Sequence, residues 1–393
     1  MAGRALGWLL ARAGQPRVIG ELLAGIAFGP SLLGALAPGA AAVLMPRSVR
    51  PGLALLAQIG MALYMFLVGL ELSAGHVRTR ARVAMVVSPV AIGLPFLAGV
   101  LLARGVFAPL SGASATAVTF PIFLGIALSI TAFPVLARIL RDRGLLQTDI
   151  GATALTCAAT NDVVVWCAMA VLIGLTRDAV GQAVVTTVGA CAFIALMLVA
   201  VRPAVERLAA RAGSGAAAVA TLAVMGAASA LVTHLLGIHA VFGAFVAGLI
   251  VPHDSPAAEV LARRLAWPVA LLLPAFFAVS GLRTELSGIG GAHGWLLCLV
   301  LIAVAMIGTG GGAAVAARAG GMPWHRAVPL GVLLSTRGLM ELVVANIGLE
   351  RGLIGPPLFS MLVVMALVTT VATSPLLAML APALQSRGAG ELR

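Results

Sequence analysis

One carboxylate lies in the middle of a long apolar stretch of this chain. Asp162 follows Asn161, and every other residue from 153 to 171 is uncharged. An aspartate at the centre of a membrane helix costs about 2.5–3.5 kcal/mol on insertion scales, so such a residue is usually retained to handle an ion or a proton. A structural polar contact between helices is the alternative interpretation. The position of Asp162 therefore predicts an ion or proton site.

The composition places this candidate site in a membrane protein. Hydrophobic residues make up 61% of the 393 residues, charged residues make up 10%, and the mean hydropathy is +1.11. Such values exclude a single water-soluble domain, and several apolar runs exceed the roughly 18 residues that span a bilayer. The sequence therefore predicts an all-α polytopic membrane protein.

The apolar runs predict about thirteen transmembrane helices, of which the first is short or truncated. The first piece, at 4–13, gives only about 15 Å of helix, which is about half the thickness of a hydrocarbon core. Gly, Pro and Arg separate nearly all the runs. The other helices are predicted at 18–36, 52–71, 83–103, 116–141, 149–174, 179–201, 214–236, 238–252, 264–283, 294–318, 325–349 and 356–382.

The net charge of +12 comes from arginines, most of which lie between the apolar runs. In a soluble protein this charge would suggest nucleic acid, but in a membrane protein it indicates topology, because cytoplasmic loops collect basic residues. Alternate loops divide the 25 basic residues into 17 on one side and 7 on the other, with Arg337 inside a helix. This bias predicts an N-terminus outside the cell, a C-terminus in the cytoplasm and no nucleic-acid partner.

Two segments of the chain are similar to each other. Residues 124–131 read LGIALSIT and residues 330–337 read LGVLLSTR. They belong to the fifth and the twelfth predicted helices, seven helices apart, so they cross the membrane in opposite directions, which is typical of an inverted repeat. Chance similarity between two helices rich in Leu and Gly is the alternative interpretation.

Each of the two segments contains a residue that disrupts a helix. Pro134 lacks an amide donor and disfavours the α conformation of the residue before it, and Gly338 loosens the backbone of the second segment. Unwound backbone is tolerated within the membrane only where it is buried in protein or lines a cavity. The sequence therefore predicts two broken helices whose facing ends form a cation site beside Asp162.

Several motifs extend this interpretation along most of the chain. They are Val18–Glu21, Gly29–Ser31, Phe66–Glu71, Ser129–Arg138, Asn161–Val163, Phe276–Leu282 and Ser335–Leu342. In order and spacing they resemble monovalent cation/proton antiporters (Na+/H+ exchanger-like), above all the branch that holds bacterial Kef-type and plant CHX-type exchangers. The resemblance covers residues from about 15 to 382.

The resemblance implies a thirteen-helix fold with a six-helix core, two crossing broken helices and a panel domain that mediates dimerisation. It places the panel and dimer helices at about 1–71 and 214–283, the linking helix at 179–201, and the core helices at about 83–174 and 294–382. Transport in the family resembles an elevator, in which the core slides past the panel with the ion bound. The family's Kef-type members carry a C-terminal nucleotide-binding domain, which we do not expect in this chain.

The matching motifs also imply roles for three residues. Asp162 is the carboxylate that alternately holds a proton and the cation, and Thr131 lies where the first helix is broken. Asn161 stands where some relatives have a second Asp, so one titrating group is absent and electroneutral exchange is expected.

Two departures from the family affect this interpretation. Thr309 aligns with a position where relatives often have Lys. The absence of that positive charge again points to electroneutral exchange, but it leaves open how cation and proton transport are coupled. The first helix is also shorter than the family's, which indicates either an interfacial segment or a truncated start.

Other polar residues have weaker claims to a role at the site. Arg337 and Glu341 are four residues apart, so they share a helical face, and structural neutralisation is favoured over gating. Ser129, Ser335 and Thr336 are candidate oxygen donors, although each serine is equally expected to bond back to its own helix. We expect ordinary helix-end roles for Glu21 and Glu71.

The sequence therefore predicts a secondary active antiporter that exchanges Na+ or K+ for H+, with no cofactor and no metal other than the transported cation. The expected setting is the bacterial cytoplasmic membrane and the expected assembly is a homodimer. Three alternatives stay open: a cation channel, a sodium-coupled symporter of organic anions with a similar fold, and a truncated paralogue that does not transport. No catalytic motif of an intramembrane enzyme is present among the residues.

Overall fold

The structure of this chain is a computed structural model. The described residues are 2–12, 17–40, 46, 48–71, 81–145, 148–175, 180–212, 215–236, 240–252 and 255–385. Within these ranges the secondary structure is helical, apart from one isolated bridge between Ser111 and Ile354.

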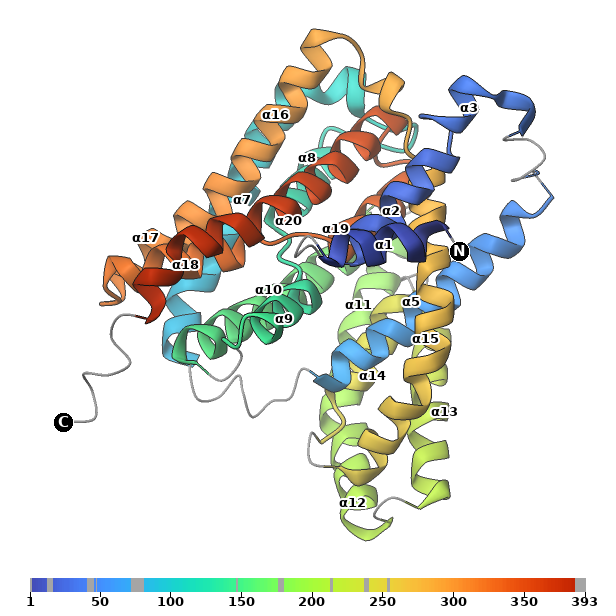
Figure 1. Ribbon diagram of the computed structural model, residues 1–393. Helices are drawn as coiled ribbons and strands as arrows, with labels where there is room; N and C mark the ends of the chain where they lie inside the picture. Colours follow the sequence, from blue (N-terminus) through green and yellow to red (C-terminus); the bar gives the residue numbers. More distant parts are fainter. Residues whose placement is uncertain are drawn as a thin grey trace. The chain divides into compact units, whose positions relative to one another are not determined.

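Eight helical stretches in the described part of the chain are long and apolar enough to cross a membrane, and shorter apolar helices accompany them (Figure 1). The eight spans are Pro51–Leu70, Met85–Val106, Asp149–Leu175, Val188–Ala209, Ala216–Leu235, Pro256–Leu282, Ala292–Ala319 and Pro356–Leu377. The predicted fold class, an all-α polytopic membrane protein, is confirmed. The orientation of the chain in the membrane stays a prediction.

The chain divides into two compact units. The first comprises Met1–Gly3, Glu21–Arg78 and Met169–Leu282, and the second comprises Arg4–Gly20, Thr79–Ala168 and Arg283–Arg393. The predicted roles of particular helices as panel, linking helix and core are not tested by this division and stay predictions.

The first unit is built around α5 (Arg50–Glu71), which packs against α14 (Ala240–Leu249) and α15 (Pro256–Leu282). Small residues allow the backbones to approach closely, as is usual between membrane helices. A Cβ atom on Gly69 would collide with the carbonyl oxygen of Phe245, and one on Gly248 would collide with that of Phe66. The other helices assigned wholly to this unit are α3 (Leu33–Leu36), α11 (Val180–Leu196), η1 (Met197–Val201), α12 (Arg202–Ala212) and α13 (Ala216–Leu235).

The second unit is built around α7 (Ala81–Leu110), which packs against α8 (Thr119–Ser129), η3 (Ile307–Gly311) and α17 (Gly312–Ala319). Its last helix, α20 (Pro356–Gln385), packs against α18 (Trp324–Leu334) and α19 (Leu339–Glu350). The other helices of this unit are α9 (Phe133–Asp142), η2 (Leu286–Ile289) and α16 (Ala292–Met306). Three of the described helices have residues in both units, namely α1 (Ala2–Arg12), α2 (Arg17–Phe28) and α10 (Asp149–Leu175).

The two helices predicted to be broken are both interrupted. Residues 130–132 separate α8 from α9, so Pro134 does not itself lie in the break but in the first turn of the following helix, where its missing amide has no helical partner to lose. Residues 335–338 separate α18 from α19. Gly338 has φ +153, a conformation that glycine adopts far more readily than other residues.

Other boundaries differ from the prediction for local reasons. The run at 18–36 is interrupted at Gly29 and Pro30, and the run predicted at 264–283 begins earlier, at Pro256. This earlier start includes the basic residue Arg263, which pairs with Glu259 one turn away at 3.2 Å on an exposed helical face. The π-helical turns at 197–201 and 307–311 were not predicted.

Candidate ion-binding site

Two consecutive buried side chains on α10 present unsatisfied oxygen atoms. Asn161 is 0% exposed and Asp162 is 1% exposed. Within the described part of the chain, neither Oδ1 of Asn161 nor Oδ2 of Asp162 has a hydrogen-bond partner. A buried polar atom without a partner is costly, so each such atom requires an explanation. A free carboxylate oxygen is suited to a proton or a cation, and a free amide oxygen is suited to a cation.

The amide of Asn161 is held in a defined orientation by the first helix break. Its Nδ2 donates to the hydroxyl of Thr131 at 3.2 Å, and that hydroxyl donates to the carbonyl oxygen of Leu334 at 3.1 Å. This relay directs the amide nitrogen to Thr131 and leaves the amide oxygen free. The structure therefore brings together Asn161 and Thr131, as the sequence predicted, and assigns Thr131 a positioning contact.

The two helix breaks are hydrogen-bonded to each other. The backbone N–H of Ala132 donates to the carbonyl oxygen of Thr336 at 2.9 Å, beside the bond from Thr131 to Leu334. The hydroxyl of Thr370 on α20 donates to the carbonyl oxygen of Arg337 at 2.6 Å. Backbone groups freed by the breaks thus find partners within the protein, which is the condition for unwound backbone at membrane depth.

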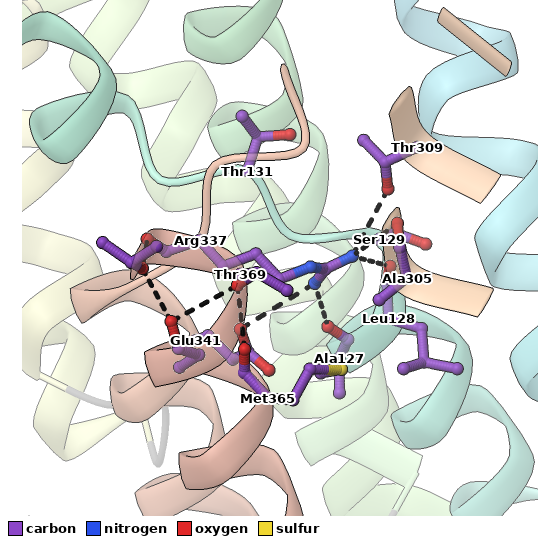
Figure 2. Close-up of polar contacts among 12 residues, drawn as sticks. Ala127, Leu128, Ser129, Thr131, Ala305, Thr309, Arg337, Glu341, Met365 and Thr369 are labelled. Carbon is purple, nitrogen blue, oxygen red and sulfur yellow. Dashed lines mark hydrogen bonds and ion pairs between the residues drawn. The ribbon is translucent and has the colours of Figure 1, made fainter. Parts of the chain in front are cut away.

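Arg337 extends from the second break to the end of the first broken helix (Figure 2). Its side chain is fully buried, and its guanidinium donates to the carbonyl oxygen of Ala127 at 2.9 Å and to that of Leu128. These carbonyls lie in the last turn of α8, where they have no partner within the helix and carry the negative end of the helix dipole. The side chain of Arg337 therefore caps and neutralises this half-helix.

The same guanidinium reaches the π-helical turn η3. Its Nη2 lies 3.5 Å from the carbonyl oxygen of Ala305 and 3.3 Å from the hydroxyl oxygen of Thr309. A π-helical turn interrupts the regular pairing of carbonyls and amides, so it makes a carbonyl accessible to an outside donor. The sequence predicted a missing cation at Thr309, but the structure places the charge of Arg337 beside this position. Sequence reasoning missed this contact, although both residues were singled out.

Arg337 and Glu341 approach each other, as their spacing predicted, but the contact is long. The distance from Nη1 of Arg337 to Oε2 of Glu341 is 3.9 Å, and Glu341 is fully buried. Neither Oε atom of Glu341 accepts a hydrogen bond from any described residue. The pair is therefore an ion pair by distance only.

The candidate accessory oxygens are hydrogen-bonded to carbonyls of their own helix, to a carbonyl of the adjacent α7 or to a neighbouring hydroxyl. Ser129 donates to the carbonyl oxygens of Gly125 at 2.7 Å and Ile92 at 2.9 Å, and Ser335 donates to that of Val332 at 2.8 Å. The hydroxyls of Thr336 and Thr373 are 3.5 Å apart. A role of these oxygens in ion binding stays a prediction, as does the role of each other candidate residue.

Two of the weaker candidates lie outside the side chains that the structure describes. Glu21 is in α2 and Glu71 is the last residue of α5, and the positions of their side chains are not described. A further polar cluster was not predicted. Arg283 donates to Oδ1 of Asn346 and to Oε1 of Glu350, both at 2.8 Å, and joins the residue that follows α15 to the end of α19.

Comparison with known proteins places the chain in a family. The profile described as "Sodium/hydrogen exchanger, transmembrane" matches residues 2–380. The Na(+)/H(+) antiporter NhaS4 of Synechocystis sp. is 40% identical over 387 residues, which cover 97% of this chain and 94% of that protein. The chain belongs to the sodium/hydrogen exchanger family, as the sequence predicted, and is a membrane transporter and not an enzyme.

More distant relatives share the same region. Cation/H(+) antiporter 19 of Arabidopsis thaliana is 38% identical over 95% of this chain, and K(+)/H(+) antiporter 1 of Saccharomyces cerevisiae is 32% identical over 94%. The chain spans about half the length of these two relatives, 47% and 44% respectively.

A solved structure has the same fold. The sodium proton antiporter MjNhaP1 from Methanocaldococcus jannaschii, at pH 8, matches with a TM-score of 0.71 over 98% of this chain and 95% of that chain. The two sequences are 13% identical, so this match concerns the fold.

Proposed function

We propose that this transporter exchanges one monovalent cation, Na+ or K+, for one proton across the membrane. The observation that carries the proposal is the pair of free buried oxygens on Asn161 and Asp162 beside two hydrogen-bonded helix breaks. The names of the relatives from Synechocystis and yeast support both ions as substrates of the family.

The exchange follows from competition at Asp162. A protonated carboxyl group is neutral and does not attract a cation, whereas the ionised group attracts one strongly. Oδ2 of Asp162 and Oδ1 of Asn161 are the two free oxygens that this proposal assigns as ligands of the cation. Because a proton and a cation exclude each other at this carboxylate, each is carried in turn.

The charges around the site support electroneutral exchange. Asn161 does not titrate, and Arg337 is held by the carbonyl oxygens of Ala127 and Leu128, so it contributes a constant charge. Only Asp162 then alternates between a proton and a cation on each half of the cycle. One positive charge moves in each direction.

An elevator movement agrees with the distribution of the site. Asn161 and Asp162, the two helix breaks and Thr309 all fall within one compact unit, the one comprising Arg4–Gly20, Thr79–Ala168 and Arg283–Arg393. That unit is suited to carry the ion past the other unit in a lipid bilayer. We further propose a homodimer formed by the panel helices and a location in the bacterial cytoplasmic membrane, both of which rest on the resemblance to the family.

The first test is proton movement in proteoliposomes under imposed Na+ or K+ gradients. Asp162→Asn is expected to abolish cation-driven proton flux. The amide of the introduced asparagine neither takes up a proton near neutral pH nor carries a charge that attracts a cation. Asp149→Asn is the matched control, since Asp149 lies exposed at the start of the same helix. The ion that drives the larger flux names the substrate.

Each alternative has its own outcome in this test. Cation flux that does not saturate and moves no protons would identify a channel, and flux that requires an organic anion would identify a symporter. If folded wild-type protein moves protons with neither ion, the exchange proposal fails and the non-transporting paralogue is favoured.

A further inference from the structure

Glu341 is a buried carboxylate for which the exchange mechanism has no use. It lies in the first turn of α19 and is fully buried. Among the described residues, no group donates a hydrogen bond to either of its oxygens. Buried charges are normally paired and hydrogen-bonded, because burial of an ion without such partners is very costly. Both oxygens of Glu341 are therefore available to a ligand.

Arg337 does not need Glu341 as a neutralising partner. Its guanidinium donates to the carbonyl oxygens of Ala127, Leu128 and Ala305. The gap of 3.9 Å to Oε2 of Glu341 is longer than the distance of a charge-assisted hydrogen bond. The negative end of α8 already compensates the charge of Arg337, so Glu341 can lose its own charge without leaving the arginine unpaired.

The described helices α8 and α20, which pack against α19, bring no further charged group to Glu341. Among the described helices, α19 packs mainly against α8 and α20, and neither of these two contains an acidic, basic or histidine residue. Arg283 contacts α19 at the far end of the helix, through Asn346 and Glu350. Arg337 and the N-terminal turn of α19 favour the ionised form of Glu341, whereas burial without hydrogen bonds opposes it.

We propose that Glu341 is a second proton-binding site of this protein, separate from Asp162, and that the protonation of Glu341 controls how firmly Arg337 is held at the end of α8. When Glu341 is neutral, Arg337 stays on the carbonyl oxygens of Ala127 and Leu128. When Glu341 releases its proton to the aqueous side, its charge competes with these carbonyls for the guanidinium. The weakened cap then loosens the end of the half-helix next to the ion site. This role rests on the proposed exchange, since it regulates the same site.

The first test measures proton binding without transport. Infrared difference spectra between acidic and alkaline buffer are recorded on purified Asp162→Asn protein, in which the principal carboxylate is absent. We expect the band of a protonated carboxyl group to remain in this protein and to be lost in the double variant Asp162→Asn/Glu341→Gln. The control double variant, Asp162→Asn/Glu350→Gln, removes a partly exposed carboxylate of the same helix and is expected to keep the band.

The outcomes separate this proposal from the proposed exchange. If the two double variants have the same spectrum, Glu341 keeps one protonation state and the second site is refuted, whatever the result of the transport assay. Should Glu341→Gln fail to fold, Glu341→Asp is used, and the proposal then requires the carboxyl band to shift in position. Loss of exchange in Asp162→Ala, by contrast, bears on Asp162 alone.

A second test examines regulation through the pH profile of exchange. Glu341→Gln is expected to flatten the dependence of the maximal rate on pH, and Glu341→Asp is expected to restore a dependence displaced along the pH axis. A merely structural carboxylate would lower the rate by the same factor at each pH, and that result would overturn the regulatory role.

Discussion

Thr131 contributes to the site through the side chain that it orients. Its hydroxyl accepts from Nδ2 of Asn161 and donates to the carbonyl oxygen of Leu334. Without this acceptor the amide of Asn161 is free to rotate, and its oxygen no longer has a fixed position. The threonine therefore limits the conformational freedom that cation binding would otherwise have to remove.

Thr131→Val tests this positioning contact. Loss of one hydrogen bond costs about 1 kcal/mol, so we expect about a fivefold higher KM for the cation. The maximal rate is expected to change less, because Asp162 is unaltered. Thr131→Ser restores the hydroxyl and should recover most of the affinity. An unchanged KM in the valine variant, measured in proteoliposomes, would contradict the positioning role.

Competition at Asp162 predicts a particular form of pH dependence. As the pH falls, a larger share of the carboxylate is protonated, and the cation must displace this proton. We expect the KM for the cation to rise by up to tenfold for each unit by which the pH falls. The maximal rate at saturating cation concentration should change with pH only through titrating groups other than Asp162. Initial rates over a matrix of pH and cation concentration measure both. A KM that is independent of pH would show that proton and cation bind at different groups.

The second helix break depends on the backbone of Gly338. Its φ of +153 is strained for any other residue, and a Cβ atom there would lie 3.0 Å from Cγ2 of Val135. Gly338→Ala is expected to lower the free energy of unfolding by about 1–3 kcal/mol. Gly93→Ala is the matched control, because a Cβ atom at Gly93 in α7 meets no atom within 4 Å. The melting temperatures of the two variants are measured by thermal denaturation in detergent. Equal melting temperatures for Gly338→Ala and Gly93→Ala would contradict the prediction.

The sequence predicted the helices and their breaks better than it predicted the contacts between them. Apolar length and the local signals of Pro134 and Gly338 act within a few residues, so they are readable along the chain. The cap on α8 joins Arg337 to Ala127, 210 residues apart, and no local pattern reports such a contact. The spacing of Arg337 and Glu341 indicated that the two residues are close. It did not indicate that the oxygens of Glu341 accept no hydrogen bond from the described residues. The π-helical turn of η3 was missed because its glycine-rich sequence equally favours close helix packing.

Electroneutral exchange is a property of the whole transporter, because every charge that moves contributes to it. If one cation replaces one proton at Asp162 and Arg337 keeps its charge, no net charge crosses the membrane in a cycle. We expect the exchange rate in proteoliposomes to be the same, within error, when a membrane potential of either sign is imposed with an ionophore.

Asn161→Asp extends this measurement. It adds a second carboxylate next to Asp162, and a variant that carries two protons for each cation would respond to the potential. If the wild-type protein itself responds to the potential, one-for-one exchange is wrong, even if cation and proton fluxes remain coupled.

The cap between Arg337 and α8 also determines when the protein can mature during its synthesis. The carbonyl oxygens of Ala127 and Leu128 enter the membrane long before their guanidinium partner has been translated, and the bridge between Ser111 and Ile354 closes later still. The growing chain must therefore hold the first broken helix in the bilayer, with its end uncompensated, until the twelfth predicted helix arrives. Ribosome stalling before residue 337 should consequently leave an inserted but protease-sensitive intermediate, which is the form that a membrane chaperone or quality-control protease would meet.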